Sequence, residues 1–323
     1  MTFETTVPAW DRLKNFKIIA LSAAHRVYRN GYQQLPVRVY VEVENPVTHA
    51  SVALTQAELD SIVLIEPLGG VELVRDASWA PATTWQYSEL KDSRFLEPTF
   101  IDGPVPDVMP TGPYVYTKDF YIRTGSRSGI TVQPRITRAD GKTFQMGEWD
   151  STYRTLRLQP VDPIVYRADQ YSLPAASYDN FSQIGDIRKV TVFKLNLIVD
   201  QRQIGFVSGS DMPAHLRVTS SNREYSGYYL VGYEHGRRMR TGGIVQWDMP
   251  DVWGRSASLP SSVVFVLVYG RRGGRVDVRT PTPDTVVNVR DSYGNRQRLT
   301  LRLTESAGTP DVSIIFARGP DDE

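Results

Sequence analysis

Val37-Arg-Val-Tyr-Val-Glu-Val43 is the stretch that decides the fold, because a valine occupies every second position along it. This alternation places the valines on one face of an extended chain, which is typical of a strand with one buried face. Val276-Asp-Val-Arg279 and Leu299-Thr-Leu-Arg-Leu303 repeat the alternation, and Thr152–Leu158 follows it in part. The continuous apolar run Val263–Tyr269 instead predicts a strand that is buried on both faces.

Clusters of turn residues separate these apolar runs. They are Arg29-Asn-Gly31, Leu68-Gly-Gly70, Ala139-Asp-Gly-Lys142, Gly270–Gly274 and Tyr293-Gly-Asn295. Gly, Asn and Asp tolerate the left-handed backbone that tight hairpins need, so this punctuation indicates antiparallel strands. The sequence therefore predicts an all-β fold.

Helix signals are few and short. In Leu54–Asp60, Thr55 and Glu58 have the spacing of a capping box, in which each side chain bonds the backbone amide of the other residue. A second candidate is Trp85–Asp92. Neither segment is long enough for an α/β architecture, so we expect one or two short helices beside the strands.

Parts of the chain resemble other parts at two offsets. An offset of 145 residues brings Gly125–Gly129 onto Gly270–Gly274 and Thr155–Leu158 onto Thr300–Leu303. A different offset brings Phe16-Lys17 onto Phe193-Lys194. Because the matches keep their order and lie in similar strand patterns, they predict an internal duplication.

The length of 323 residues and the mass of 36.4 kDa exceed what a single core usually supports. We expect two tandem antiparallel β-sandwich domains, Ig-like or jelly-roll-like, at residues 14–160 and 187–318. Residues 1–13 would be an N-terminal extension, 161–186 a linker rich in proline and aromatic residues, and 319–323 an acidic tail.

Composition excludes several classes of function. The net charge is +1, so no global field favours nucleic acid or an anionic membrane. The chain contains no cysteine, which removes disulfides, thiolate metal ligands and cysteine nucleophiles. No apolar run reaches the length of a membrane span, and the N-terminal residues lack the pattern of a Sec signal peptide. We therefore expect neither a nucleic-acid partner nor a membrane span.

The sequence contains no recognisable motif for catalysis or cofactor binding. The four histidines, His25, His49, His215 and His235, show no metal-ligand spacing. Gly141-Lys142-Thr143 resembles the end of a phosphate-binding loop, but Ile136 stands where that motif needs its first glycine. No G-x-S-x-G segment presents a serine nucleophile. We expect no enzyme activity, no cofactor and no metal.

One segment has the residues of a sugar-binding site. Trp247, Asp248, Asp251 and Trp253 combine two carboxylates with two indole rings, which can grip a glycan. A strand end followed by a proline turn explains the same residues without any ligand. The segment therefore stays a candidate glycan site, with exposure of the two indole rings as the deciding feature.

Arginine and tyrosine mark a candidate protein interface. No lysine follows Lys194, so the second half of the chain carries its positive charge on arginine. The candidates are Arg127, Arg237, Arg238, Arg240, Arg271, Arg272 and Arg275 in turns or at hairpin tips, and Tyr229 and Tyr233 on a predicted strand. Arg and Tyr are enriched at protein interfaces. Solvated turns and a tyrosine-containing core remain the alternative interpretation.

These features together favour a non-enzymatic structural or interaction subunit of a large assembly. We expect a bacteriophage virion or phage-tail-like particle, with the chain as an accessory, tail or baseplate protein that contacts other subunits and forms a homo-oligomer. Its location would be the virion or a cytoplasmic assembly. The alternative is a carbohydrate- or receptor-binding protein, for example a toxin-associated one, that uses the loop Pro98–Pro113 and the segment Trp247–Trp253.

Overall fold

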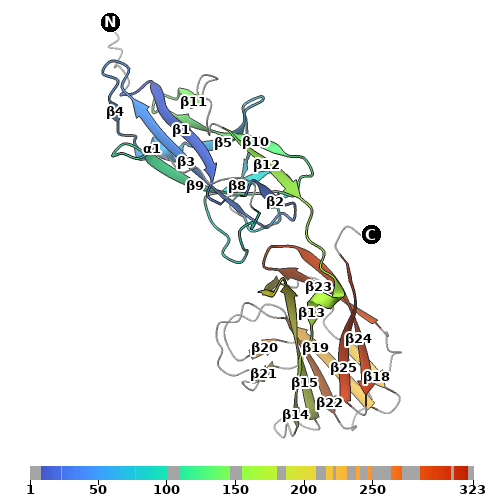
Figure 1. Cartoon of the computed structure of the whole chain (residues 1–323). Coiled ribbons are helices and arrows are strands. Elements are labelled where there is room, and N and C mark those ends of the chain that lie inside the picture. The colour runs from blue at the N-terminus through green and yellow to red at the C-terminus, as the bar shows by residue number, and fades with distance from the viewer. Residues whose placement is uncertain are drawn as a thin grey trace. The chain divides into compact units, whose positions relative to one another are not determined.

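The computed structural model describes most, but not all, of the chain (Figure 1). The described residues are 9–22, 24–76, 78–100, 110–145, 155–179, 187–208, 216–220, 223–230, 238–240, 246–248, 263–270, 284–306 and 309–318. Side-chain burial is described for those up to 174, for 195–207 and for 288–300. The chain divides into two compact units, Met1–Asp162 and Pro163–Glu323. Both units consist mainly of strands, which confirms the all-β prediction.

The first helix prediction is confirmed and the second is wrong. Helix α1 spans Gln56–Asp60, and Thr55 and Glu58 form the expected capping box. Within Trp85–Asp92 the structure has instead strand β8, Gln86–Ser88. The side chain of Tyr87 is fully buried in β8, and the strand pairs with the neighbouring strand β9, Tyr116–Arg123. Pairing with a strand distant in sequence thus overrode a weak helical tendency.

One sheet of the first unit has the order β1-β3-β9-β8-β7, with β4 beside β3 (Figure 1). The remaining bounds are β1 Arg12–Ala20, β3 Leu35–Glu44, β4 Ser51–Val52 and β7 Val74–Arg75. The alternating valine stretch therefore lies in a central strand, β3, which pairs on one side with β1 and on the other with β9.

The second sheet has the order β2-β12-β10-β5-β6, with β11 beside β10. Its strands are β2 Arg26–Tyr28, β5 Val63–Glu66, β6 Val71–Glu72, β10 Ile130–Thr137, β11 Thr143–Gln145 and β12 Leu156–Val161. The predicted Asp-Gly turn joins β10 to β11, with Gly141 at φ +85°. One hydrophobic cluster contains residues of both sheets, among them Val39 of β3, Phe120 of β9 and Val132 of β10.

The second face of β3 is more covered than the alternation predicted. Glu42 is buried, and its carboxylate accepts hydrogen bonds from Lys14 and Ser51 at 2.9 and 2.6 Å. Arg38 donates to both oxygens of Asp119 on β9 at 2.6 and 2.8 Å. Cross-strand polar pairs therefore cover a face that the sequence pattern assigned to solvent.

The second unit contains a sheet of order β13-β15-β22-β19-β18, with β14 and β16 also beside β15. Its strands are β13 Tyr171–Ser172, β14 Ala175–Asp179, β15 Ile187–Val199, β16 Arg202–Ile204, β18 Leu216–Ser220, β19 Arg223–Leu230 and β22 Val263–Gly270. The predicted strand Val263–Tyr269 is thus β22, between β15 and β19.

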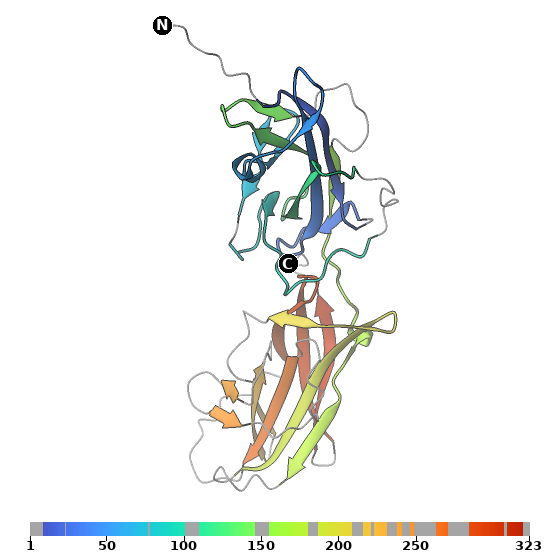
Figure 2. The ribbon, with the colours of Figure 1, turned by 90° about the vertical axis from the view of Figure 1, so that its left-hand side faces the viewer.

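A four-stranded sheet and a two-stranded ribbon complete the described part of this unit. The four-stranded sheet has the order β17-β23-β24-β25, where β17 is Phe206–Ser208, β23 Asp284–Asp291, β24 Arg296–Ser306 and β25 Thr309–Arg318. Figure 2 shows β23, β24 and β25 as adjacent red strands. The ribbon pairs β20, Arg238–Arg240, with β21, Gln246–Asp248.

Two strands and a short 3-10 helix lie in the described part of the segment 161–186, which the sequence predicted to be a linker. Strands β13 and β14 both pair with β15, and the short 3-10 helix η1, Ala168–Gln170, precedes them. The chain divides between Asp162 and Pro163, so residues 163–179 belong to the second unit. Two aromatic residues of the segment, Tyr171 and Tyr178, lie in these paired strands.

The sequence repeats can be placed on the strands of the sheets in each unit. The matches at an offset of 145 residues lie in equivalent positions of the two units, whereas the match of Phe16 with Phe193 does not. The segment 125–129 leads from β9 in one sheet to β10 in the other, and Gly270 ends β22 before β23 begins the second sheet. Leu156 lies in β12, which pairs with β10, and Leu301 lies in β24, which pairs with β23. In contrast, β1 is separated from β9 by β3, whereas β15 lies directly beside β22. The match of Phe16 with Phe193 therefore joins strands in different positions.

Candidate functional site at the loop end of the first unit

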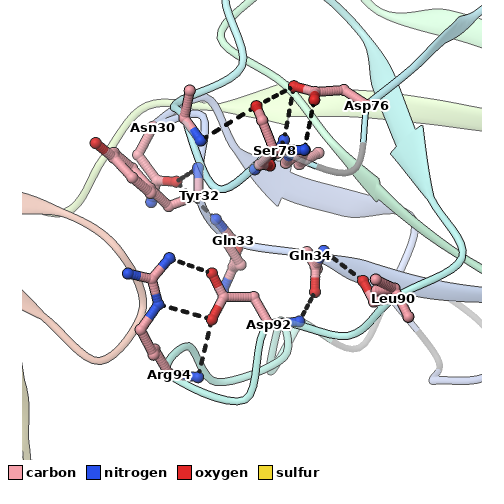
Figure 3. A network of polar contacts seen from close by, with 11 residues as sticks. Asn30, Tyr32, Gln33, Gln34, Asp76, Ser78, Leu90, Asp92 and Arg94 are labelled. Carbon is pink, nitrogen blue, oxygen red and sulfur yellow. Dashed lines mark hydrogen bonds and ion pairs between the residues drawn. The ribbon is translucent and has the colours of Figure 1, made fainter.

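Three segments of the first unit form the surface that we call the loop end. They are residues 29–34, 76–100 and 124–129, and a network of buried polar contacts joins the first two (Figure 3). Asn30 begins the network, because its side-chain oxygen accepts hydrogen bonds from the backbone amides of Tyr32 and Gln33 at 2.9 Å each. Such an Asx turn sets the direction in which the chain enters β3.

Two adjacent glutamines bind the 76–100 segment to β3. Gln33 and Gln34 are buried at the point where this strand begins. The Gln34 amide donates to the carbonyl of Leu90 at 3.2 Å and accepts from the backbone amide of Asp92 at 2.6 Å. Because buried amides need partners, these bonds fix the path of residues 90–92 (Figure 3).

Asp92 in turn holds Arg94. The carboxylate is 6% exposed and accepts from Nε and Nη2 of Arg94 at 2.9 and 2.7 Å, as well as from its backbone amide. This hydrogen bonding raises the pKa of the Arg94 guanidinium above its ordinary value. The geometry is a bidentate fork, which orients the guanidinium plane. Arg94 is therefore a charged group with a defined direction at the surface.

A second ion pair anchors the start of the same segment. Arg123 of β9 is 2% exposed and donates to Asp76 at 3.0 Å and to the carbonyl of Ser78 at 2.7 Å. Hydrogen bonds from the Ser78 hydroxyl and amide, together with the charge of Arg123, hold the pKa of Asp76 below its ordinary value. A buried arginine with these partners makes the positions of Asp76 and Ser78 costly to change.

Close backbone approach brings the third segment to the other two. Gly31 donates to the carbonyl of Thr124 and accepts from the amide of Ala82, both at 2.9 Å. A Cβ on Gly125 would lie 2.3 Å from the Ala82 oxygen, so only glycine fits there. The indole of Trp85 donates to the carbonyl of Ser128 at 2.7 Å.

On this rigid support the loop end exposes large apolar side chains. Trp79 is 45% exposed, Leu90 56% and Leu96 50%. The Arg94 guanidinium lies 5.8 Å from the Trp79 ring and 5.4 Å from the Phe95 ring. Trp and Arg dominate the energetics of protein interfaces. Exposed Trp, Arg and Leu side chains within one loop segment have the composition of a binding surface.

Arg127 is the candidate from the sequence whose side chain the structure describes. It is exposed, and it lies in the segment 124–129 of the loop end. Arg238, Arg240, Trp247 and Asp248 lie in the β20–β21 ribbon, where Arg238 is opposite Asp248 and Met239 opposite Trp247. The ribbon therefore brings Arg238 and Arg240 together with Trp247 and Asp248. Tyr229 lies in β19, opposite Phe265.

The remaining candidates lie outside the described residues. They are Arg237, Arg271, Arg272, Arg275, Tyr233, Asp251 and Trp253. Trp79 and Arg94 were not among the residues predicted from the sequence, because the segment 76–100 has no regular period. The available signal was a tryptophan followed by Ala80 and Pro81 in an irregular stretch, where binding residues are often found.

We expect Asp92→Ala to lower the free energy of unfolding of the first unit by about 1–2 kcal/mol, because it removes a buried acceptor of three hydrogen bonds. Urea denaturation of the full chain measures the change. Asp169→Ala is the matched control: Asp169 makes the same fork with Arg167 but is 66% exposed, and we expect no measurable change there. Equal losses in the two variants would contradict the structural role of Asp92.

Two further observations bear on the class of the protein. Within the described ranges, no three His, Asp or Glu residues gather into a group that could hold a metal ion. None of the helices in those ranges has the length and apolarity needed to cross a lipid bilayer. Comparison of the chain with protein families, with curated proteins and with solved structures found no match.

Proposed function

We propose that the chain is a non-enzymatic subunit of a large assembly and that the loop end of the first unit is one of its contact surfaces. The observation that carries the proposal is the exposure of Trp79, Leu90 and Leu96 in the same segment as the oriented Arg94. Buried hydrogen bonds hold this surface in place, so little conformational entropy is lost when a partner binds. A preorganised aromatic and arginine surface suits protein recognition.

For the assembly itself we propose a bacteriophage virion or phage-tail-like particle, in which the chain is an accessory, tail or baseplate protein. The support is by analogy: two β units without cysteine suit such particles. We further propose that each unit is a sandwich and that the two arose by duplication. The pair β10–β12 of the first unit corresponds to the pair β23–β24 of the second, which supports the duplication. Because β1 and β15 occupy different positions in their sheets, this support covers only the C-terminal half of each unit.

Sedimentation of native extracts tests the subunit proposal. The full chain is expected to sediment with high-mass particles, and Trp79→Ala combined with Arg94→Ala is expected to reduce the bound fraction about tenfold or more, because interface Trp and Arg often each contribute at least about 2 kcal/mol. Val47→Ala is the control, since Val47 is 76% exposed in the turn between β3 and β4, away from the loop end. A chain that stays monomeric in its native source would overturn the proposal.

A carbohydrate- or receptor-binding protein is the second candidate. The exposed Trp79 ring and the pairing of β20 with β21, which places Asp248 opposite Arg238, favour it. Indole rings stack on the apolar face of sugars, and nearby carboxylates bond their hydroxyl groups. Glycan-array binding by the purified chain that is lost in Trp79→Ala or Trp247→Ala would favour this candidate over the first.

A further inference from the structure

The outer edge of β25 is a long strand edge without a partner in the described part of the chain. The strand spans Thr309–Arg318 and pairs with β24 along its length. It is the last strand of its sheet, and no described strand pairs with its other side (Figure 2). Such an edge presents a row of backbone donors and acceptors that can pair with another strand.

Between Asp311 and Arg318, no proline or lysine of β25 discourages such pairing, because Pro310, which cannot donate a backbone hydrogen bond, precedes this stretch. Asp311 and Arg318 flank the mostly apolar stretch Val312–Ala317, and the strand contains no lysine. The edge strand β1 of the first unit differs, because Arg12, Lys14 and Lys17 give it positive charge only, and two copies would repel each other. In β25 the two charges are opposite and stand near the two ends.

A β-bulge places these two charges on one face of the sheet. Thr300 and Leu301 are neighbours on β24, but they are opposite Phe316 and Ile314 of β25. Ile315 is therefore one extra residue in β25 with no residue of β24 opposite it. Asp311 is opposite Thr304 and Arg318 is opposite Arg298. Arg298 and Thr304 are six residues apart on β24 and therefore lie on the same face. A residue of β25 lies on the same face as the residue of β24 that it stands opposite. Asp311 and Arg318 therefore share a face although they are seven residues apart.

The shared face makes the edge complementary to itself. When two antiparallel strands are related by a two-fold axis, residues that lie opposite each other must belong to the same face. An axis beside Ile314 and Ile315 places Asp311 of one copy opposite Arg318 of the other at both ends, and Val312 opposite Ala317. Without the bulge, the spacing of seven would put the two charges on opposite faces.

We propose that the outer edge of β25 pairs antiparallel with β25 of a second copy of this chain, so that the two four-stranded sheets join across a two-fold axis. The dimer also brings Asp311 of the second copy beside Arg318, which within its own sheet is opposite another arginine, Arg298. This inference rests on the proposal that the chain is a subunit of an assembly, and it identifies a second copy of the chain as one of the partners.

A single cysteine reports the pairing, because the chain has none of its own. In the proposed dimer the two copies of residue 315 lie about 6 Å apart between Cα atoms, which a disulfide can bridge. We expect Ile315→Cys to form a covalent dimer on mild oxidation of the full chain. Thr309→Cys is the control, because its two copies would be about 35 Å apart and should not link. Equal linking in both variants, or none in either, would overturn the proposal.

Charge reversal provides an independent test of the register. Light scattering of the purified chain is expected to show twice the mass of 36.4 kDa. Asp311→Arg and Arg318→Asp should each weaken the dimer about tenfold, because each creates two like-charge contacts, and the double reversal should restore it. A mass that does not respond to either reversal would overturn the β25 pairing. Sedimentation with native particles, measured separately, would then still decide the subunit proposal.

Discussion

Replacement of Gly31 by alanine is expected to lower the free energy of unfolding of the first unit by about 2–4 kcal/mol. Gly31 has φ +76°, a backbone conformation that is strained for any residue with a Cβ atom. The added Cβ would also lie 2.6 and 2.8 Å from the backbone oxygen and nitrogen of Ala82. These are backbone atoms, so they cannot move aside as a flexible side chain would. The segment 76–100 would have to shift.

Urea denaturation of the full chain measures this loss, and Gly70→Ala is the matched control. Gly70 has a similar φ of +63°, but no atom lies within 4 Å of its added Cβ. The control therefore carries the backbone strain alone, and we expect it to cost about 1 kcal/mol. Equal losses at the two positions would show that the close approach to Ala82 does not matter. We also expect Gly31→Ala, unlike Gly70→Ala, to weaken particle binding through the loop end.

The second unit is expected to become more stable as the pH falls from 7, because of Asp291. This carboxylate lies in the turn between β23 and β24, where it accepts hydrogen bonds from the backbone amides of Tyr293 and Asn295 at 2.9 and 2.8 Å. It is fully buried in a region that also contains the buried Tyr166 and Tyr171. Burial raises the pKa of Asp291 to about 6, although its hydrogen bonds oppose the shift.

Because the folded pKa is raised, the folded unit binds the proton more tightly than the unfolded chain. The free energy of unfolding of the second unit is therefore lowest above pH 6 and rises as the pH falls. The rise is about 1 kcal/mol between pH 7 and 5, and about 3 kcal/mol once the pH is below the unfolded pKa of about 4. Scanning calorimetry of the full chain over this range measures the effect. Asp291→Asn should remove it, and Asp200→Asn, at an exposed turn of the same unit, should leave it unchanged. If the Asp291→Asn variant still became more stable on acidification, Asp291 would not be the group responsible.

The first unit is expected to respond in the opposite sense. Burial raises the pKa of Glu58, but the hydrogen bonds from Thr55, Trp10 and Ala139 outweigh it, so this pKa ends below its ordinary value. The folded pKa of Asp76 is lowered as well. Such groups contribute stability above their unfolded pKa and lose it as the pH falls below about 5. On acidification the calorimetric transition of the first unit should therefore move to lower temperature, while that of the second unit moves to higher temperature.

Much of the strand pattern could be predicted because it depends on local chemistry. The valines of β3 are all fully buried, as their alternation predicted, and the capping box of α1 needed only Thr55 and Glu58 three residues apart. The Asp-Gly turn before β11 likewise depends on the intrinsic freedom of Gly141. These features lie within a few residues of one another, so the sequence carries their physical cause directly.

The loop end could not be predicted in the same way. Its polar network joins Gln34 to Asp92 and Arg123 to Asp76, residues that are 47 or more positions apart. Nothing in the pattern around Trp79 or Arg94 shows that a buried glutamine and a buried arginine hold their loop. The strand β8 depends in the same way on pairing with β9, which a local helical tendency did not reveal.

By itself, then, the sequence determined the all-β class, the valine face of β3, the first helix and the hairpin turns that contain Gly70, Gly141 and Gly294, because each follows from the conformational preference of neighbouring residues. Only the tertiary structure decided that β13 and β14 join the second unit, that polar pairs cover the other face of β3, and that a bulge at Ile315 puts Asp311 and Arg318 on one face. Those features depend on which distant strands pair and in which register. Pairing is set by burial summed over the whole unit, which no local stretch contains.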